Sequence, residues 1–253
     1  MGSVGKFYKL TTTLREHLNG IAAAVQYNRI VLTLDRYVEQ LSGWTSAPAV
    51  MVSGALHRLA GEILCEDIVQ QQAEEIIRCR KGCAHCCKQL VMVSEPEGRT
   101  LFLHAQRHGM ALPLAKIERQ SGRDDAGWLA LPPEDRGCIF LGSDNSCQVY
   151  DIRPLSCRKY FAISDPALCD TEKFPSGRVA IWYSLDVEVV TSAAFTALGS
   201  GSLASVIGRH LRHEYRSRWR SQFIKMPKNQ LYFCDDYHYN LARKGRLLAP
   251  VTA

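Results

Sequence analysis

Four cysteines fall within nine residues, in the segment CRKGCAHCC that runs from Cys79 to Cys87. Thiols placed this close together either bind a metal as thiolates or form strained local disulfides. Gly82 allows the tight turn that would bring several sulfurs toward one point. Cys86 and Cys87 are adjacent, and neighbouring side chains of an extended backbone point to opposite faces. This vicinal pair therefore favours two metal centres, or one centre and its immediate surroundings, over a single mononuclear site.

Whether these cysteines bind metal or form disulfides depends on the cellular compartment of the protein. The chain has 253 residues, of which 46% are hydrophobic and 22% charged, as expected for a globular protein with a full core. It has ten cysteines, whereas disulfide scaffolds are usually short secreted chains. The N-terminal sequence MGSVGKFYKLTTTLREHLNG lacks the apolar region of a secretory signal. We therefore expect a cytoplasmic protein whose reduced thiols bind metal.

A second block of cysteines is spread over a longer stretch, with gaps of nine, ten and twelve residues between Cys138, Cys147, Cys157 and Cys169. These gaps are too wide for a local metal-binding turn, so the fold would have to bring the sulfurs together. Together with the first block they make eight candidate ligands, enough for two four-thiolate sites or one larger cluster. The alternative is that the second block is structural and lies beside a single site built by the first. Cys65, among apolar helical residues, is predicted to be an inert core thiol.

Basic side chains accompany the second block, because Arg153 and Arg158 flank Cys157. Guanidinium groups near clustered thiolates would offset their negative charge and lower their pKa values. We therefore predict that both arginines contact the cofactor; the alternative for Arg153 is an ion pair with Asp151 or another surface carboxylate. His85 lies between two cysteines, but with so many thiolates available it is expected to be exposed or to sit behind the ligands.

The secondary-structure pattern is mainly helical. Apolar residues at helical spacing predict helices over the first forty residues and from Ser46 toward Cys79, so that the second helix would lead directly into the first cysteine block. The sequence Ser94-Glu95-Pro96-Glu97 has the form of a capping box and predicts another helix start. Two short apolar runs around residues 142–146 predict a β-hairpin from Cys138 to Tyr150.

These elements predict an α+β fold that is mainly helical, with a small β-hairpin around a cysteine-rich metal site. We expect three segments: an N-terminal helical segment (1–78), a cysteine-cluster metal-binding domain (79–170) and a C-terminal extension (171–253) that packs on the same core. Residues 189–208 carry no charge but are rich in Ser, Thr, Ala and Gly, so no membrane span is expected.

The C-terminal extension is basic. From residue 207 onward it holds ten of the 31 Lys and Arg residues but three of the 25 Asp and Glu residues. The run from Arg209 to Arg220 includes Tyr215 and Trp219, and we interpret it as an amphipathic helix with its arginines in solvent. The alternative is that it binds a protein substrate or an acidic partner; nucleic-acid binding is not expected.

The order of these motifs resembles the YkgJ-type cysteine-cluster family, whose core is described as a zinc- or iron-chelating domain. The resemblance covers about residues 79 to 170 and rests on CRKGCAHCC, VSEPE, CIFL, CQVYDIRPLSCRKY and the late Cys169. The first gap is C-x3-C, one residue longer than the spacing usual in the family. The bacterial flagellin lysine-N-methylase looks like a distant relative that shares the cysteine motif.

The resemblance implies a multi-cysteine metal centre. We expect an iron–sulfur cluster or iron, with zinc as the alternative, since sulfur ligation suits both. The corresponding function is redox or protein-modification chemistry; the alternative is a zinc-stabilised interaction module without catalytic activity.

Overall fold

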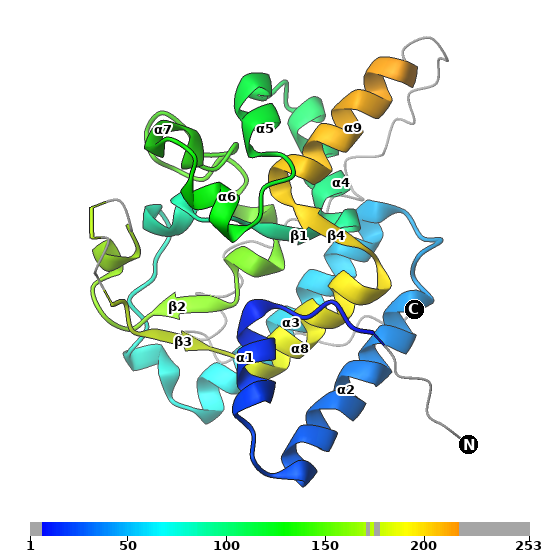
Figure 1. Cartoon of the computed structure of the whole chain (residues 1–253), viewed down its shortest axis with the longest axis vertical. Coiled ribbons are helices and arrows are strands. Elements are labelled where there is room, and N and C mark those ends of the chain that lie inside the picture. The colour runs from blue at the N-terminus through cyan, green and yellow to red at the C-terminus, as the bar shows by residue number, and fades with distance from the viewer. Residues whose placement is uncertain (1–6, 171–172, 175–177, 218–253) are drawn as a thin grey trace.

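The computed structural model describes residues 7–170, 173–174 and 178–217. Its elements are mainly helices, with two small two-stranded antiparallel sheets, so the predicted fold class is confirmed. Figure 1 shows the helices in two layers: α1, α2, α3 and α8 lie in the lower half, and α4, α5 and α9 in the upper half.

The lower layer is built around one largely buried helix, α8 (Leu185–Ala197), which contacts α1 (Thr12–Gly20), α2 (Ala24–Ser42) and α3 (Ala49–Gln70). Nine consecutive residues of α8, from Val187 to Phe195, are buried, because other helices pack against it on several sides. The buried apolar side chains that α8 and these three helices bring together form a cluster that we call the lower core. It includes Leu14, Leu34, Leu56, Leu64 and Val190. The predicted boundaries of the three segments stay a prediction, although α2 and α3 pack on α8 across them.

The upper layer joins β1 (Met92–Ser94) and α4 (Glu95–Arg107) to α5 (Leu114–Gln120), β4 (Ser200–Ser202) and α9 (Leu203–Ser217). The predicted capping box at Ser94 and Glu97 is present at the start of α4. Helices α4 and α9 approach closely because Gly98 has no side chain, and an added Cβ would collide with Val206. The cluster between them is the upper core; it includes Leu101, Phe102, Phe140, Val206 and Ile207.

Helix α3 does not lead directly into the cysteines, which corrects one expectation. It begins after Pro48 rather than at a Ser46 cap, and it ends at Gln70. Gln72 then adopts a left-handed backbone conformation with φ of 52°, which no helix can continue through. A short 3₁₀ turn, η1 (Ala73–Glu75), follows and redirects the chain toward Cys79.

The predicted hairpin from Cys138 to Tyr150 is reduced to a turn with a single bridge between Leu141 and Cys147. The paired strands lie elsewhere: β1 pairs with β4, and β2 (Tyr160–Ala162) pairs with β3 (Ile181–Tyr183). The remaining short elements surround the cysteine region: α6 (Asp125–Leu129), α7 (Pro133–Arg136), η2 (His85–Lys88), η3 (Tyr150–Ile152), η4 (Leu155–Cys157) and η5 (Pro166–Cys169).

The basic C-terminal helix is present as α9, and Leu211 packs against the upper core. The side chain of Tyr215, all of Trp219 and the rest of the tail lie outside the described residues. None of the helices that the structure describes is long and apolar enough to cross a membrane.

Candidate metal centre

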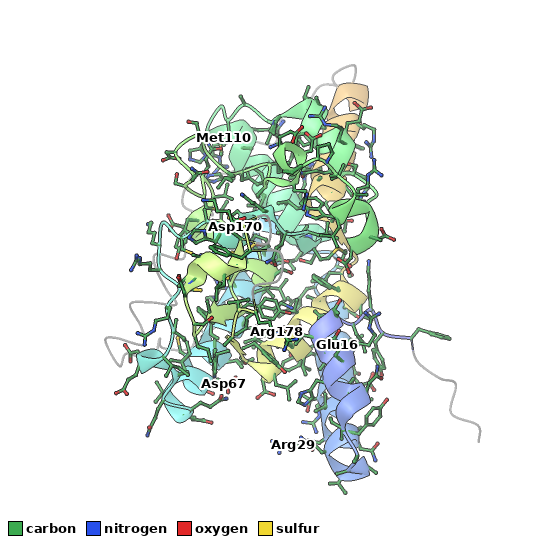
Figure 2. All side chains as sticks on the ribbon, turned by 60° about the vertical axis from the view of Figure 1, so that its left-hand side comes forward. Glu16, Arg29, Asp67, Met110, Asp170 and Arg178 are labelled. Atoms are coloured by element: carbon green, nitrogen blue, oxygen red, sulfur yellow. The ribbon has the colours of Figure 1, made fainter. Side chains whose placement is uncertain are left out.

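Three of the eight candidate ligands pack against the two cores. Cys79 packs against the lower core, whereas Cys138 and Cys147 pack against the upper core. The two cysteine blocks are joined directly, because the backbone N–H of Cys138 donates to the carbonyl oxygen of Cys87 at 2.7 Å. Asp170, which follows the last cysteine, marks the middle of the molecule in Figure 2.

The first block is shaped by a tight turn. The N–H of Cys83 donates to the carbonyl oxygen of Arg80 at 3.0 Å, and Gly82 between them has φ of 90°. Glycine is the residue that this turn position requires, since a side chain is strained at positive φ. After this turn, the 3₁₀ helix η2 presents Cys86 and Cys87.

Three side-chain contacts fix η2 against its surroundings. Trp128 Nε1 donates to the carbonyl oxygen of Lys88 at 3.0 Å, and Lys88 Nζ lies 3.2 Å from an oxygen of the buried Asp170 carboxylate. Gln89 Nε2 lies 3.5 Å from the carbonyl oxygen of Cys169. These supporting residues were not predicted from the sequence. A signal was available, because Lys88 and Asp170 have opposite charges and each directly follows a candidate ligand.

Two cysteines of the second block receive the same local hydrogen bond. The backbone N–H of Phe140 donates to Sγ of Cys138, and that of Val149 donates to Sγ of Cys147, each from two residues further along the chain. These N–H groups are directed at sulfur rather than at a neighbouring strand, which explains why the predicted hairpin forms a single bridge. Burial nevertheless dominates and raises the pKa of Cys138 to about 11.

The thiols form one electrostatic cluster centred on Cys86. Burial raises the pKa of five of them, and a negative charge on Cys86 raises each further: Cys79, Cys138, Cys147, Cys157 and Cys169. The hydrogen bond between Cys86 and Cys87 lowers the pKa of Cys86 and raises that of Cys87. Several thiolates can therefore coexist here only if a positive charge joins them.

Comparison with known proteins adds one finding. Residues 78–175 match the CxxCxxCC family model. That family is described as "Putative zinc- or iron-chelating domain", which agrees with the resemblance found in the sequence. No curated protein and no solved structure matches the chain. The matched residues, called the CxxCxxCC segment below, contain all eight candidate ligands but neither Cys65 nor Cys234.

The two arginines of the CxxCxxCC segment have different surroundings. The positive charge of Arg153 opposes the burial-driven increase in the pKa of Cys79, Cys147 and Cys157. Its guanidinium carbon lies 3.9 Å from the centre of the Tyr150 ring, and its buried Nε has no hydrogen-bond partner among the described residues.

Arg158 is buried and serves the backbone instead. It donates to the carbonyl oxygens of Arg153, at 2.6 Å, and of Asp151. The structure therefore brings Arg153 among the thiols and uses Arg158 to fix the loop that carries Arg153.

Cys65 lies on α3, outside the thiol cluster. Burial and the charges of Glu62 and Glu66 raise its pKa to about 11, and none of the eight candidate ligands contributes to that shift. It behaves as the inert thiol that was expected.

The donor set of the CxxCxxCC segment fits a thiophilic metal. None of the nine described cysteines forms a disulfide, and their mutual repulsion favours a bound cation. Backbone N–H groups already point at three of the sulfurs. Within the ranges that the structure describes, no three Cys, His, Asp or Glu side chains are arranged to hold one metal ion. The assignment of individual thiols as ligands stays a prediction.

Proposed function

We propose that the CxxCxxCC segment holds a polynuclear iron–thiolate centre of the iron–sulfur type, which serves redox or protein-modification chemistry. Eight thiols in one electrostatic cluster exceed the four that a single zinc or iron ion takes. The adjacent Cys86 and Cys87 add to this argument, since two neighbouring side chains do not easily face the same ion.

The observation that carries the proposal is the accessibility of the thiols. Cys86 and Cys157 are solvent-exposed. Burial nonetheless raises the pKa of Cys157 well above its ordinary value, so protein atoms surround its sulfur although the residue as a whole is exposed. A structural zinc site is closed by its four protein ligands, whereas a reactive centre keeps a side that reactants can approach. The exposure of residues Cys86 and Cys157 therefore favours a reactive centre.

Within this proposal each part of the chain has a defined task. Cys79, Cys83, Cys86 and Cys87 supply thiolates from the first block, and Cys138, Cys147, Cys157 and Cys169 from the second. The N–H groups of Phe140, Val149 and Ala162 hold the sulfur atoms in place and stabilise their negative charge. Arg153 offsets part of the remaining charge. When bound, an iron–sulfur centre supplies one-electron transfer at a potential that such hydrogen bonds adjust.

A specific observation also supports the alternative, a zinc-stabilised interaction module. The thiols come from segments that pack on different cores, so any bound ion would link the two layers of the fold. Such a link is what a structural zinc contributes to folding.

Metal analysis and visible absorption of anaerobically purified full-length protein distinguish the two functions. The proposal expects more than one iron per chain and a visible absorption that bleaches on reduction. Zinc at full occupancy without iron, in a colourless protein that unfolds with chelator, would replace it with the interaction module.

A further inference from the structure

A groove opens beside the first cysteine block. Its volume is about 600 Å³, and its two walls come from residues 78–85 and 163–167. The first wall presents Arg78, Arg80, Lys81, Cys83 and His85. A cavity of this size is typical of sites for small molecules, which usually range from about 300 to 1,000 Å³.

Backbone hydrogen bonds fix the two walls relative to each other. The N–H of Arg78 donates to the carbonyl oxygen of Ala162 at 2.8 Å, directly before the second wall begins. The first wall contains the turn that the hydrogen bond from Cys83 to Arg80 closes. Lys81, at the centre of that turn, lies 3.7 Å from Asp151 and 5.3 Å from the centre of the Tyr150 ring. Backbone hydrogen bonds therefore fix the shape of the groove.

The charge of the groove is unbalanced. Arg78, Arg80 and Lys81 line the groove with one carboxylate, that of Asp165; because Lys81 also pairs with Asp151, an excess of one positive charge remains. Asp165 is already engaged, because its Oδ1 accepts from the N–H of Ala167 at 2.9 Å. Arg78 and Arg80 are exposed and form no ion pair with any residue that the structure describes. An anion that enters the groove can therefore pair with both guanidinium groups.

We propose that this groove binds a small phosphate-bearing molecule and holds it beside Cys83. A phosphate monoester carries between about −1.5 and −2 charges at neutral pH, opposite in sign to the excess charge of the groove. Guanidinium groups bind phosphate oxygens through paired, charge-assisted hydrogen bonds. The groove is much larger than one phosphate group, so the rest of the ligand contacts the wall formed by Ile163 and Pro166.

This inference deepens the proposed function, because the placement of the ligand next to a reactive centre rests on that centre. Binding itself does not require the metal, since none of the cationic groove residues is a candidate ligand. The two ideas can therefore fail separately: a metal-free chain that binds phosphate esters contradicts only the proposed function.

Isothermal titration calorimetry tests the proposal on the full-length protein, with inorganic phosphate and glycerol 3-phosphate as probes. Sodium chloride at matched ionic strength controls for screening. We expect both probes to bind, the ester more tightly, and the exchange of both Arg78→Gln and Arg80→Gln to weaken binding by at least about tenfold. The matched control is Arg29→Gln with Arg36→Gln, two exposed arginines on α2; Figure 2 labels Arg29 far from Asp170.

Iron and zinc content measured on the same samples should be unchanged in both variants. The single exchange Arg80→Gln, on an exposed side chain, provides a second folded variant with an intermediate effect. Absence of binding of either probe to the wild-type protein would overturn the proposal. So would equal affinity in the groove variant and the α2 control.

Discussion

The backbone N–H of Ala162 donates a hydrogen bond to Sγ of Cys79 at 3.1 Å. The carbonyl oxygen of Ala162 accepts from the N–H of Arg78 at 2.8 Å. One residue of β2 therefore binds both the backbone of Arg78 and the side chain of Cys79, at the start of the first cysteine block. Residues 83 positions apart in the sequence thus set the position of the first thiol. Cysteine spacing alone gives no indication of this contact.

The vicinal pair provides the first test of the ligand set. We expect Cys86→Ser to lower the bound metal per chain by at least about half, since one missing thiolate opens a four-ligand site. Cys65→Ser is the matched control, because Cys65 is a described thiol outside the cluster. Elemental analysis of both variants, purified in parallel, measures the difference. Equal metal content in the two variants would remove Cys86 from the ligand set.

Arg153 should control the pH at which metal is lost. Burial raises the pKa of Cys79, Cys147 and Cys157, and the charge of Arg153 opposes this increase. Without the guanidinium their pKa values rise, so protons displace metal from the thiolates at a higher pH. We expect Arg153→Gln to move the midpoint of metal loss upward by about half to one pH unit. Arg119→Gln, which removes a partner of Asp135 instead, should leave the midpoint in place.

The midpoint is measured by following metal release with a chromogenic chelator as the pH is lowered. A midpoint that does not differ between the wild-type protein and Arg153→Gln would show that Arg153 does not act on the thiolates.

A buried ion pair joins Lys159, the residue directly before β2, to α8. Lys159 Nζ lies 2.6 Å from Oε2 of Glu188, the two residues are 3% and 0% exposed, and Thr11 Oγ1 donates to the same oxygen at 2.6 Å. Lys159→Met leaves a buried carboxylate without its cation, and we expect the free energy of unfolding to fall by about 3–5 kcal/mol. Adding Glu188→Leu should restore most of that loss.

Urea denaturation of the single and double variants measures these changes. Lys81→Met, which breaks an exposed pair with Asp151, should cost less than about 1 kcal/mol. A double variant as unstable as the single one would mean that the pair is not coupled as the geometry indicates.

Stability should decrease in acid before carboxylates titrate. Burial, together with the charges of His108 and Arg107, lowers the pKa of His104 to about 4, from an ordinary value of 6.5. Between these values the unfolded chain binds a proton on His104 that the folded chain does not bind. This contribution to stability is therefore complete above pH 6.5 and is lost as the pH falls toward 4.

The expected slope from His104 is at most about 1.4 kcal/mol per pH unit. Denaturation of the wild-type protein and of His104→Gln at pH 7, 6 and 5 measures it, with the exposed His213→Gln as control. The His104 variant should lose less stability over this range than the control, and identical slopes would exclude His104 as the cause.

The sequence by itself determined the features that depend on neighbours along the chain. The capping box of Ser94 and Glu97 requires residues three apart, and it starts α4 as predicted. The helical pattern and the density of cysteines in the CxxCxxCC segment likewise depend on short spacings. They predicted the mainly helical class and the match to a chelating-domain family, because local backbone preferences and thiol chemistry hold whatever the rest of the chain does.

Tertiary structure decided which distant residues contact these local features. Arg153 and Arg158 looked equivalent in the sequence, yet packing places one among the thiols and the other on backbone carbonyls. The hairpin expected from Cys138 to Tyr150 gave way to N–H groups directed at sulfur. The groove exists only because residues 78–85 meet residues 163–167. Such contacts depend on the packing of two cores formed from distant segments, and a local sequence pattern cannot predict them.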